Sequence, residues 1–341
     1  MNIQLTSNQC PDVWCAAVSA DTLYVHRLHT GLCLTAASAG LALFLAPGIA
    51  QAQTPHVRRT VETVPLTVTV RDRGGRHVTD LNRDDFELYE NGRAQAISLF
   101  ERDRVPITLT VVLDASRSMA TDIEGAKTIV NQLLDLLRPG DLGSIIDCSA
   151  SVRQPPTADV DVLRRTVSDI VVRGTTALYD SMSLATQLAT TDRRAAQHGT
   201  YQHVMVVVSD GVDTSSTTNI DAVLARFRAR GTVVYVVRPT RTPPAATGRI
   251  AQHLDGEYLR TLRRVADATG GDLLVTPVAG RDYSAVRTRI GRALSSTYLL
   301  AYSPSTPAAP EARVTVRLKR RGLRIHATRL APPANLVGIL D

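Results

Sequence analysis

The sequence predicts an α/β fold: a doubly wound parallel sheet, flanked by sandwich-like β segments from both chain ends. Short apolar runs rich in β-branched residues, at 107–113 and 204–208, suit parallel strands that are buried on both faces. Between residues 105 and 240 such runs alternate with segments in which apolar residues recur at helical spacing. This alternation favours a parallel sheet with helices on both of its faces.

The chain ahead of this region predicts a small β unit. Apolar and polar residues alternate over 66–70, and Asn91-Gly92 favours a tight hairpin turn with residues 96–100 as the returning strand. A unit of this size is too short to bury a large core alone. We therefore expect three alternating strands from the C-terminal end to join it: residues 298–302, 314–318 and 323–327, the last two joined across 320–322.

Within the α/β region, periodic apolar residues predict helices and continuous apolar runs predict strands. The first helix, residues 123–137, is expected directly after Ser118, with its positive N-terminal end facing that residue. The other expected helices are 160–171, 178–188, 220–230, 259–266 and 283–294, and the other expected strands are 143–149, 232–237 and 273–275, with 242–248 as a loop. The expected division of the chain is 1–52 for an N-terminal extension and signal peptide, 53–104 for the β unit, 105–295 for the α/β domain and 296–341 for C-terminal strands and tail.

The first 52 residues predict a targeting segment. Residues 31–50 carry no charge, follow the basic Arg27 and close in the small-residue sequence Ala50-Gln51-Ala52. This order is typical of a cleaved secretory signal. An uncleaved membrane anchor is the alternative, although Pro47 makes the segment a poor span. The prediction is export to the periplasm or the outside of a bacterium, with no membrane span left in the mature chain.

Export would leave the mature chain with one cysteine, Cys148, and so with no internal disulfide. Cys148 lies in an apolar strand segment, where a cysteine usually serves as a small buried hydrophobe. We expect it to have no redox role.

Acids and hydroxyls collect where the predicted strands and helices meet. Asp114, Ser116 and Ser118 follow one apolar run, Asp210 follows the other, and Thr176 precedes a predicted helix. Because ligands of open α/β sheets collect beyond the carboxyl ends of the strands, these residues can converge. Two carboxylates and three hydroxyls, without Cys or His, form a hard oxygen shell. Such a shell suits Mg²⁺ or Mn²⁺, with Ca²⁺ as a further option, rather than zinc or copper.

Each segment also has a plain structural explanation. Asp114 and Ser116 can cap the following helix, Thr176 can cap its own helix, and Asp210-Gly211 is a common turn pair. The occurrence of all three segments in this order, each at a strand or helix boundary, favours the metal site.

The pattern Asp114-x-Ser116-x-Ser118, then a distant Thr176, then a distant Asp210, resembles the metal-ion-dependent adhesion site of the von Willebrand factor A domain family. The resemblance implies that the serines and the threonine contact the ion and that the aspartates bind it largely through water. It further implies that a partner protein completes the shell with an Asp or Glu carboxylate. More loosely, the segments on either side resemble those that flank the A domain in related bacterial proteins.

The charge balance is basic, with 39 Lys and Arg against 32 Asp and Glu and a net charge of +7. Seven bases fall between Arg313 and Arg329, alternating with apolar residues. This pattern predicts the solvated outer face of a strand pair, or else a surface for an acidic envelope component such as lipid headgroups or a polyanionic cell-wall polymer. Export and an aromatic content of 4% argue against nucleic acid as a partner.

Enzyme motifs are missing from the sequence: there is no G-x-S-x-G, no P-loop and no H-E-x-x-H. We therefore expect an exported, non-enzymatic protein that binds a partner protein through a metal ion, as an adhesion or scaffold module. Two alternatives stay open: a structural domain with a vestigial metal site, and a hydrolase whose cation activates water.

Overall fold

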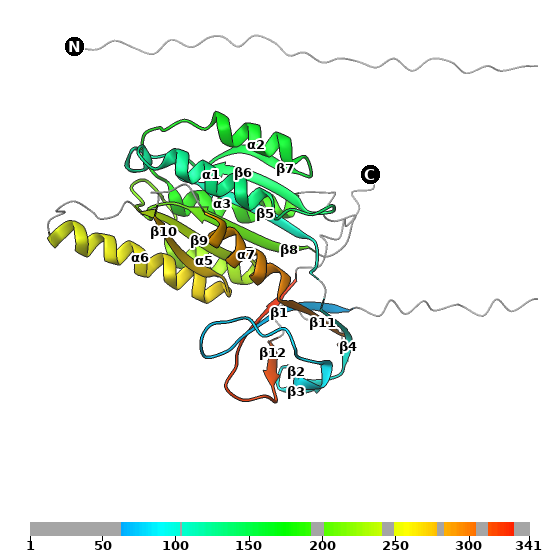
Figure 1. Ribbon diagram of the computed structural model, residues 1–341. Coiled ribbons are helices and arrows are strands. Elements are labelled where there is room, and N and C mark those ends of the chain that lie inside the picture. The colour runs from blue at the N-terminus through cyan, green and yellow to red at the C-terminus, as the bar shows by residue number, and fades with distance from the viewer. Residues whose placement is uncertain are drawn as a thin grey trace, which may run out of the picture. The chain divides into compact units, whose positions relative to one another are not determined.

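The computed structural model describes residues 63–102, 104–191, 201–240, 249–277, 283–304 and 313–330 (Figure 1). All of them belong to one compact unit, Arg59–Asp341. The predicted signal peptide and the predicted loop at 242–248 lie outside the described residues.

A six-stranded sheet forms the centre of the α/β domain, in the order β10-β9-β8-β5-β6-β7. The first five of these pair in parallel, and β7 runs antiparallel at the edge. All seven residues of β5 are buried, which explains why its sequence is continuously apolar rather than alternating. The strands are β5 (Ile107–Leu113), β6 (Leu142–Asp147), β7 (Ser151–Thr157), β8 (Gln202–Val208), β9 (Val233–Thr240) and β10 (Asp272–Pro277).

Helices cover both faces of this sheet (Figure 1). One core contains buried residues of α1, α2 and α7 against the sheet, and a second core contains those of α3, α5 and α6. This is the doubly wound arrangement that the sequence predicts. The helices are α1 (Ile123–Leu134), α2 (Val160–Asp169), α3 (Leu178–Thr191), α5 (Ile220–Arg230), α6 (Arg249–Thr269) and α7 (Ser284–Ser295).

Two details of this domain differ from the sequence-based expectation. Strand β7 was not predicted, because its Pro155 and Pro156 argue against a strand; at a sheet edge, however, proline is tolerated since its missing N–H faces no neighbour. Helix α1 starts at Ile123 as predicted but ends at Leu134, and a 3-10 turn, η2 (Arg117–Met119), contains Ser118 ahead of it.

Strands from both ends of the unit form two further sheets, as the sequence predicts. One has the order β13-β1-β11-β4 and the other β12-β2-β3, and they share a core that includes Leu66, Leu88 and Leu300. We call these two sheets the β module. Its strands are β1 (Val64–Arg71), β2 (Phe86–Glu90), β3 (Arg93–Gln95), β4 (Ile97–Glu101), β11 (Thr297–Tyr302), β12 (Val314–Leu318) and β13 (Arg324–Arg329), with a 3-10 turn η1 (Arg83–Asp85) ahead of β2.

The Asn91-Gly92 turn forms as predicted, with φ angles of 49° and 81°, and it joins β2 to β3. The predicted strand 96–100 is present as β4, but it is not the strand that returns against β2. The shorter β3 pairs with β2, and after a break at Ala96 β4 pairs with β11 in the other sheet. Likewise β12 and β13 do not pair with each other, because β12 pairs with β2 and β13 with β1. Each break lets one segment of chain serve both layers of a small core.

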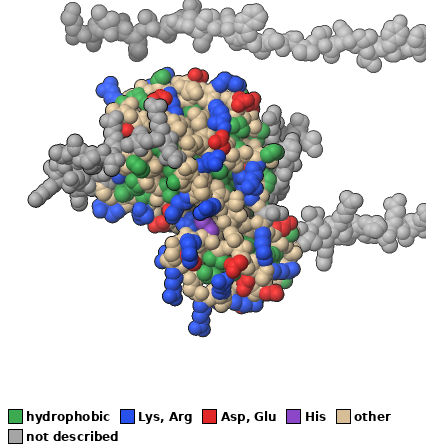
Figure 2. Space-filling view, in the orientation of Figure 1, with side chains coloured by type: hydrophobic (Ala, Val, Ile, Leu, Met, Phe, Trp, Pro, Cys, Tyr) green, Lys and Arg blue, Asp and Glu red, His purple; other side chains and the backbone are tan. Residues whose placement is uncertain are grey.

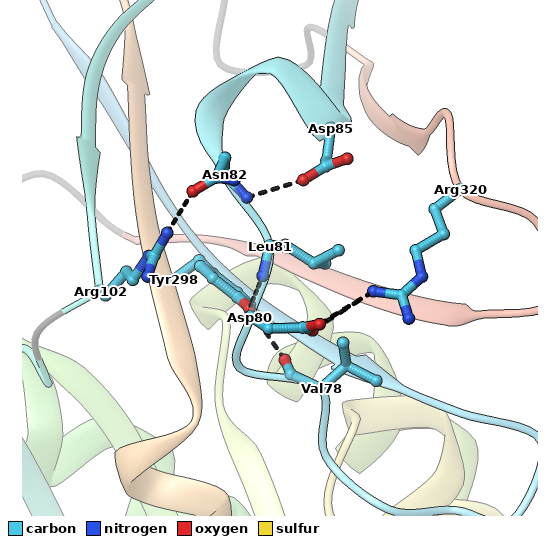
Figure 3. A network of polar contacts seen from close by, with 8 residues as sticks. All are labelled: Val78, Asp80, Leu81, Asn82, Asp85, Arg102, Tyr298 and Arg320. Carbon is cyan, nitrogen blue, oxygen red and sulfur yellow. Dashed lines mark hydrogen bonds and ion pairs between the residues drawn. The ribbon is translucent and has the colours of Figure 1, made fainter.

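A buried tyrosine fixes the loop between β1 and β2 (Figure 3). The hydroxyl of Tyr298 donates to the carbonyl of Val78 at 2.9 Å and accepts from the amide of Leu81 at 3.1 Å. At the rim of the same network, Arg320 pairs with Asp80 at 3.2 Å. Of the seven C-terminal bases, the six whose exposure is described are all exposed, which agrees with a solvated face for this strand region.

The β module is tied to the α/β domain by Arg71, whose guanidinium donates to the carbonyls of Gly270 at 3.4 Å and Gly271 at 3.2 Å. Gly271 is required at this contact, since a Cβ there would lie 1.9 Å from the carbonyl oxygen of Val234. Among the described residues, no helix has both the length and the apolar composition needed to cross a membrane.

Candidate metal centre

The predicted site residues lie at the carboxyl ends of adjacent strands. Strand β5 ends at Leu113 and β8 at Val208, and the two pair in parallel to their last residues. The amide of Asp114 then donates to the carbonyl of Val208 at 2.9 Å, which extends the pairing by one step. Asp114 and Ser209 are thereby held side by side, although 95 positions separate them in the chain.

Asp114 is fully buried and accepts two hydrogen bonds. Its Oδ1 accepts from the amide of Ser116 at 3.0 Å, and its Oδ2 accepts from Oγ of Ser209 at 2.6 Å. Burial raises the pKa of this carboxyl above its ordinary value, and the nearby charge of Asp210 adds a smaller rise; the serine hydrogen bonds oppose both. No ion pair joins Asp114 to any described cation.

The two motif serines are brought together by the η2 turn. Their Oγ atoms lie 3.0 Å apart, with Ser116 buried and Ser118 exposed. One hydroxyl therefore faces the protein and the other is open to solvent. Two hydroxyls at this separation can serve as neighbouring ligands of one small cation.

Thr176 reaches the same edge of the sheet through its loop. The amide of Arg173 donates to the carbonyl of Ala115 at 2.7 Å, which fixes this loop against the serine motif. The carbonyl of Thr176 accepts from the amides of Thr214 at 2.9 Å and Ser215 at 3.0 Å, in the loop that follows β8. Thr176 itself is 2% exposed. All three sequence segments thus meet, although no direct hydrogen bond joins Thr176 to Asp114.

Asp210 is half-buried, and its Oδ1 accepts from the amide of Val212 at 3.0 Å. The next residue, Gly211, has φ +95° and donates its amide to Oγ of Ser209 at 2.9 Å. A side chain at Gly211 would be strained by that angle and would bring a Cβ within 2.8 Å of Leu262. Glycine therefore lets the chain turn sharply while Asp210 stays at the strand end.

The donor set fits a hard divalent cation. Asp114 is a buried carboxylate surrounded by hydroxyl and amide donors, and burying a charge is costly unless an opposite charge compensates it. In the described part of the chain, no three side chains of His, Cys, Asp or Glu are grouped as a metal site. The predicted shell differs from such a group, since it has two carboxylates and three hydroxyls.

Sequence reasoning missed the residues that hold the surrounding loops. Asp213 accepts from the amide of Tyr179 at 2.9 Å and from Oγ of Ser216 at 2.6 Å, and Asp180 accepts from the amides of Thr217 and Thr218, both at 2.9 Å. These contacts join the start of α3 to the loop after β8. The sequence signal was available, because residues 213–218 consist only of Asp, Ser and Thr, the residues that hydrogen-bond to nearby backbone.

Cys148 is buried at 2% exposure in the core that lies against α3 and α5, and it forms no disulfide. Burial raises the pKa of its thiol well above the ordinary value, and nearby aspartates raise it further. The thiolate is therefore disfavoured, and the expectation of a small buried hydrophobe is confirmed.

Residues 109–212 match the family model of the von Willebrand factor type A domain. No curated protein matches the sequence of this chain. Among solved structures, the chain is similar to the conserved hypothetical protein BatB from Bacteroides thetaiotaomicron, at 17% identity and TM-score 0.43, over 55% of this chain and 97% of that one. It is also similar to a von Willebrand factor type A protein from Catenulispora acidiphila, at 11% identity and TM-score 0.42, over 80% of this chain and 74% of that one.

A third similar structure is proximal thread matrix protein 1 from the mussel byssus, with a zinc-occupied metal-ion-dependent adhesion site. The identity is 13% and the TM-score 0.44, over 60% of this chain and half of that one. At such low values these structural likenesses carry no argument about function. The family match over 109–212, together with the doubly wound sheet to which this segment contributes β5, β6, β7 and β8, does identify the domain. Residues 109–212 thus belong to a von Willebrand factor type A domain, a family whose domains commonly serve protein interaction or adhesion.

Proposed function

We propose that this protein is an exported, non-enzymatic binding module that engages a partner protein through a divalent cation. Asp114, Ser116, Ser118, Thr176 and Asp210 would hold the cation, and an Asp or Glu carboxylate of the partner would complete its shell. The cation supplies positive charge that an external carboxylate can bind. The uncharged segment at 31–50 and the small-residue sequence after it support export.

The buried carboxylate of Asp114 is the observation that carries this proposal. It is enclosed by two serine donors at the exact edge of the sheet where the other four residues gather, and no described cation neutralises it. A divalent ion would compensate its charge. Since the other ligands are mainly hydroxyls, the ion would keep part of its charge for a ligand from outside.

The hydroxyl geometry supports a binding role over hydrolysis by a serine nucleophile. Oγ of Ser116 hydrogen-bonds to Oγ of Ser118, and Oγ of Ser209 donates to Asp114. Within the described residues, no histidine hydrogen-bonds to any of these three hydroxyls. A serine nucleophile needs such a base to remove its proton.

The first test is calorimetric titration of Mg²⁺, Mn²⁺ and Zn²⁺ into chelator-treated protein. Zn²⁺ is included because the mussel byssus protein carries it, although the all-oxygen shell here favours the harder ions. We expect saturable binding of Mg²⁺ or Mn²⁺ that Asp114→Asn abolishes. The matched control is Asp169→Asn, an exposed aspartate at the end of α2.

Equal binding by wild type and Asp114→Asn would refute the metal centre. Saturable binding of Zn²⁺ with no binding of Mg²⁺ or Mn²⁺, in both wild type and control, would keep the site but contradict the choice of ion. Partner binding is then tested with the same variants. The wild type and Asp169→Asn should capture the partner protein, lose it on chelation and bind it again when Mg²⁺ is added, whereas Asp114→Asn should not capture it.

A further inference from the structure

Two cavities open along α7, a third adjoins them at the loop after β1, and none of the proposed metal ligands lines any of the three. The largest, of about 640 Å³, is lined by the loop at Gly74 and Arg76 and by Thr288 and Arg292 of α7. A second, of about 380 Å³, shares Thr288 and Arg292 with it. A third, of about 420 Å³, shares Gly74 and Arg76. Because neighbours share wall residues, the three form one continuous groove, which we call the arginine groove.

The walls of the groove are strongly basic, and Figure 2 shows Lys and Arg side chains gathered over this region. Three aspartates line it, one in each cavity: Asp72, Asp135 and Asp272. The arginines that line it are Arg73, Arg76, Arg104, Arg138, Arg287, Arg289, Arg292 and Arg321. The charge of Arg104 is neutralised by Asp141, which does not itself line the groove. The two form a buried ion pair in which the side chain of Arg104 is 5% exposed and that of Asp141 is 3% exposed. The other seven arginines exceed the three aspartates by four charges.

Four of these arginines are exposed and are not engaged by the protein: Arg73, Arg138, Arg292 and Arg321. With the described residues, their side chains form neither an ion pair nor a hydrogen bond. They are spread over all three cavities, so the unmatched charge runs the length of the groove. They come from four separate segments: the loop after β1, the turn before β6, helix α7 and the turn between β12 and β13. A single small anion cannot contact arginines on all four segments, whereas an extended polyanion can.

The rest of the lining excludes two classes of polyanion. No Phe, Tyr or Trp lines any of the three cavities, so bases of single-stranded nucleic acid would find no stacking surface. Apolar lining is limited to a few residues such as Leu136, Leu294 and Ala285, which gives an acidic peptide no deep anchor pocket. Hydroxyls stand there instead, from Ser284 and Thr288 of α7 and from Ser296.

The three aspartates distinguish the remaining candidates. Each aspartate is paired with an arginine, Asp72 with Arg76, Asp135 with Arg287 and Asp272 with Arg289. All three are at least partly exposed, so their remaining lone pairs can accept hydrogen bonds from a ligand. A polymer made only of phosphate groups has no donor to offer at these three points. A sugar chain brings hydroxyl donors for the aspartates and acidic groups for the arginines. We infer that the arginine groove binds a linear acidic polysaccharide.

The test uses a fluorescently labelled heparin oligosaccharide as the probe, with fluorescence anisotropy as the readout. The test variant is the triple R73A/R138A/R292A, which removes one unpaired arginine from each cavity and leaves every aspartate pair intact. The matched control is R93A/R165A/R228A, which removes three exposed arginines elsewhere on the protein. Net charge changes equally in both. Thermal unfolding of each variant establishes that it is folded.

We expect saturable binding that weakens with salt, a loss of affinity of about 100-fold in the groove variant and less than about threefold in the control. Equal losses in the two triples would show non-specific attraction to a basic protein and overturn the inference. The metal chelator should leave binding unchanged, which separates this site from the proposed metal centre.

Competition assigns the polymer class. Polygalacturonate should displace the probe, and neutral dextran should not. Displacement by polyphosphate or polyglutamate at lower concentration than by polygalacturonate would overturn the polysaccharide in favour of a mineral polymer or an acidic protein, respectively. If duplex DNA is the strongest competitor, the inference fails as well.

Discussion

Oγ of Ser209 donates a 2.6 Å hydrogen bond to Oδ2 of Asp114, and this contact joins the ends of β5 and β8 beneath the proposed metal centre. Both residues are fully buried. Ser209 also accepts from the amide of Gly211. One hydroxyl therefore orients a carboxylate on one strand and a turn on the next.

Ser209→Ala should destabilise the chelator-treated protein by about 1–3 kcal/mol, because Oδ2 of Asp114 and the amide of Gly211 both lose a buried partner. Urea unfolding measures this. Ser215→Ala, at an exposed position of the neighbouring loop, is the control and should cost less than about 0.5 kcal/mol. Similar costs for the two variants would mean that the Ser209 contact does not organise the site.

Ser116→Ala and Asp210→Ala should abolish cation binding while costing less than about 1.5 kcal/mol of folding stability. The reason is geometric. The hydroxyl of Ser116 hydrogen-bonds to Oγ of Ser118, and the carboxylate of Asp210 accepts from the amide of Val212. Titration calorimetry and urea unfolding are measured on the same samples. Undiminished cation binding by both variants would remove these residues from the ligand set.

The sequence could predict that the candidate residues converge because the signals are local. Asp114 and the two serines closely follow one apolar strand, Asp210 closely follows another, and parallel strands bring their carboxyl ends to one edge. The sequence could not predict which hydrogen bonds join the loops to one another. The contacts of Asp213 with Tyr179 and of Arg173 with Ala115 depend on two loops meeting in space, and no spacing in the chain encodes that.

Tyr298→Phe should destabilise the protein by about 1–3 kcal/mol, since the buried amide of Leu81 loses its acceptor and Val78 loses a donor. Tyr89→Phe is the control. Its hydroxyl donates to Glu87 on a partly exposed strand, so its loss should fall within about 0.5 kcal/mol. Equal effects in thermal unfolding would show that water replaces the Tyr298 contacts.

Arg104→Met should cost about 3–5 kcal/mol, because it leaves the buried carboxylate of Asp141 without its cation. The carboxylate of Asp141 also accepts from the amides of Ile107 and Arg138. It therefore ties the first residue of β5 to the turn that precedes β6. Arg164→Met removes a half-exposed partner of Asp135 and should cost less than about 1 kcal/mol. The comparison is made by urea unfolding at neutral pH.

His203 predicts a loss of stability in mild acid. Burial lowers the pKa of its imidazole to about 4 from 6.5, with a further decrease from the charge of Arg230. The unfolded chain binds the proton first, so stability is complete above pH 6.5 and falls as the pH decreases toward about 4, by roughly 3 kcal/mol.

His203→Gln should flatten that part of the pH profile while keeping a hydrogen-bonding group opposite Oγ1 of Thr108, which lies 2.6 Å from Nδ1 of His203. Free energies of unfolding between pH 7 and pH 4 are compared for the two proteins. Parallel profiles would show that His203 does not contribute to the acid sensitivity.

The strand pairing of the β module could not be predicted from the sequence. The alternation of apolar and polar residues predicted its strands, but this alternation does not indicate which strand pairs with which. The break at Ala96, and the separation of β12 from β13, follow from the need to close two layers around Leu66 and Leu300. That is a property of the assembled core rather than of any one segment.

The placement of β1 between β11 and β13 determines how a mechanical load would pass through the protein. Leu66 faces Arg329 in antiparallel register, so the start of β1 and the end of β13 lie at the same end of their sheet, and a pull between them separates the two strands one hydrogen bond at a time. The chain enters the α/β domain after β4 and leaves it into β11, and these two strands pair with each other, Glu101 opposite Leu299. Their pairing joins the two connections to the α/β domain. A pull between the start of β1 and the end of β13 would therefore load the β module while the six-stranded sheet stays unloaded.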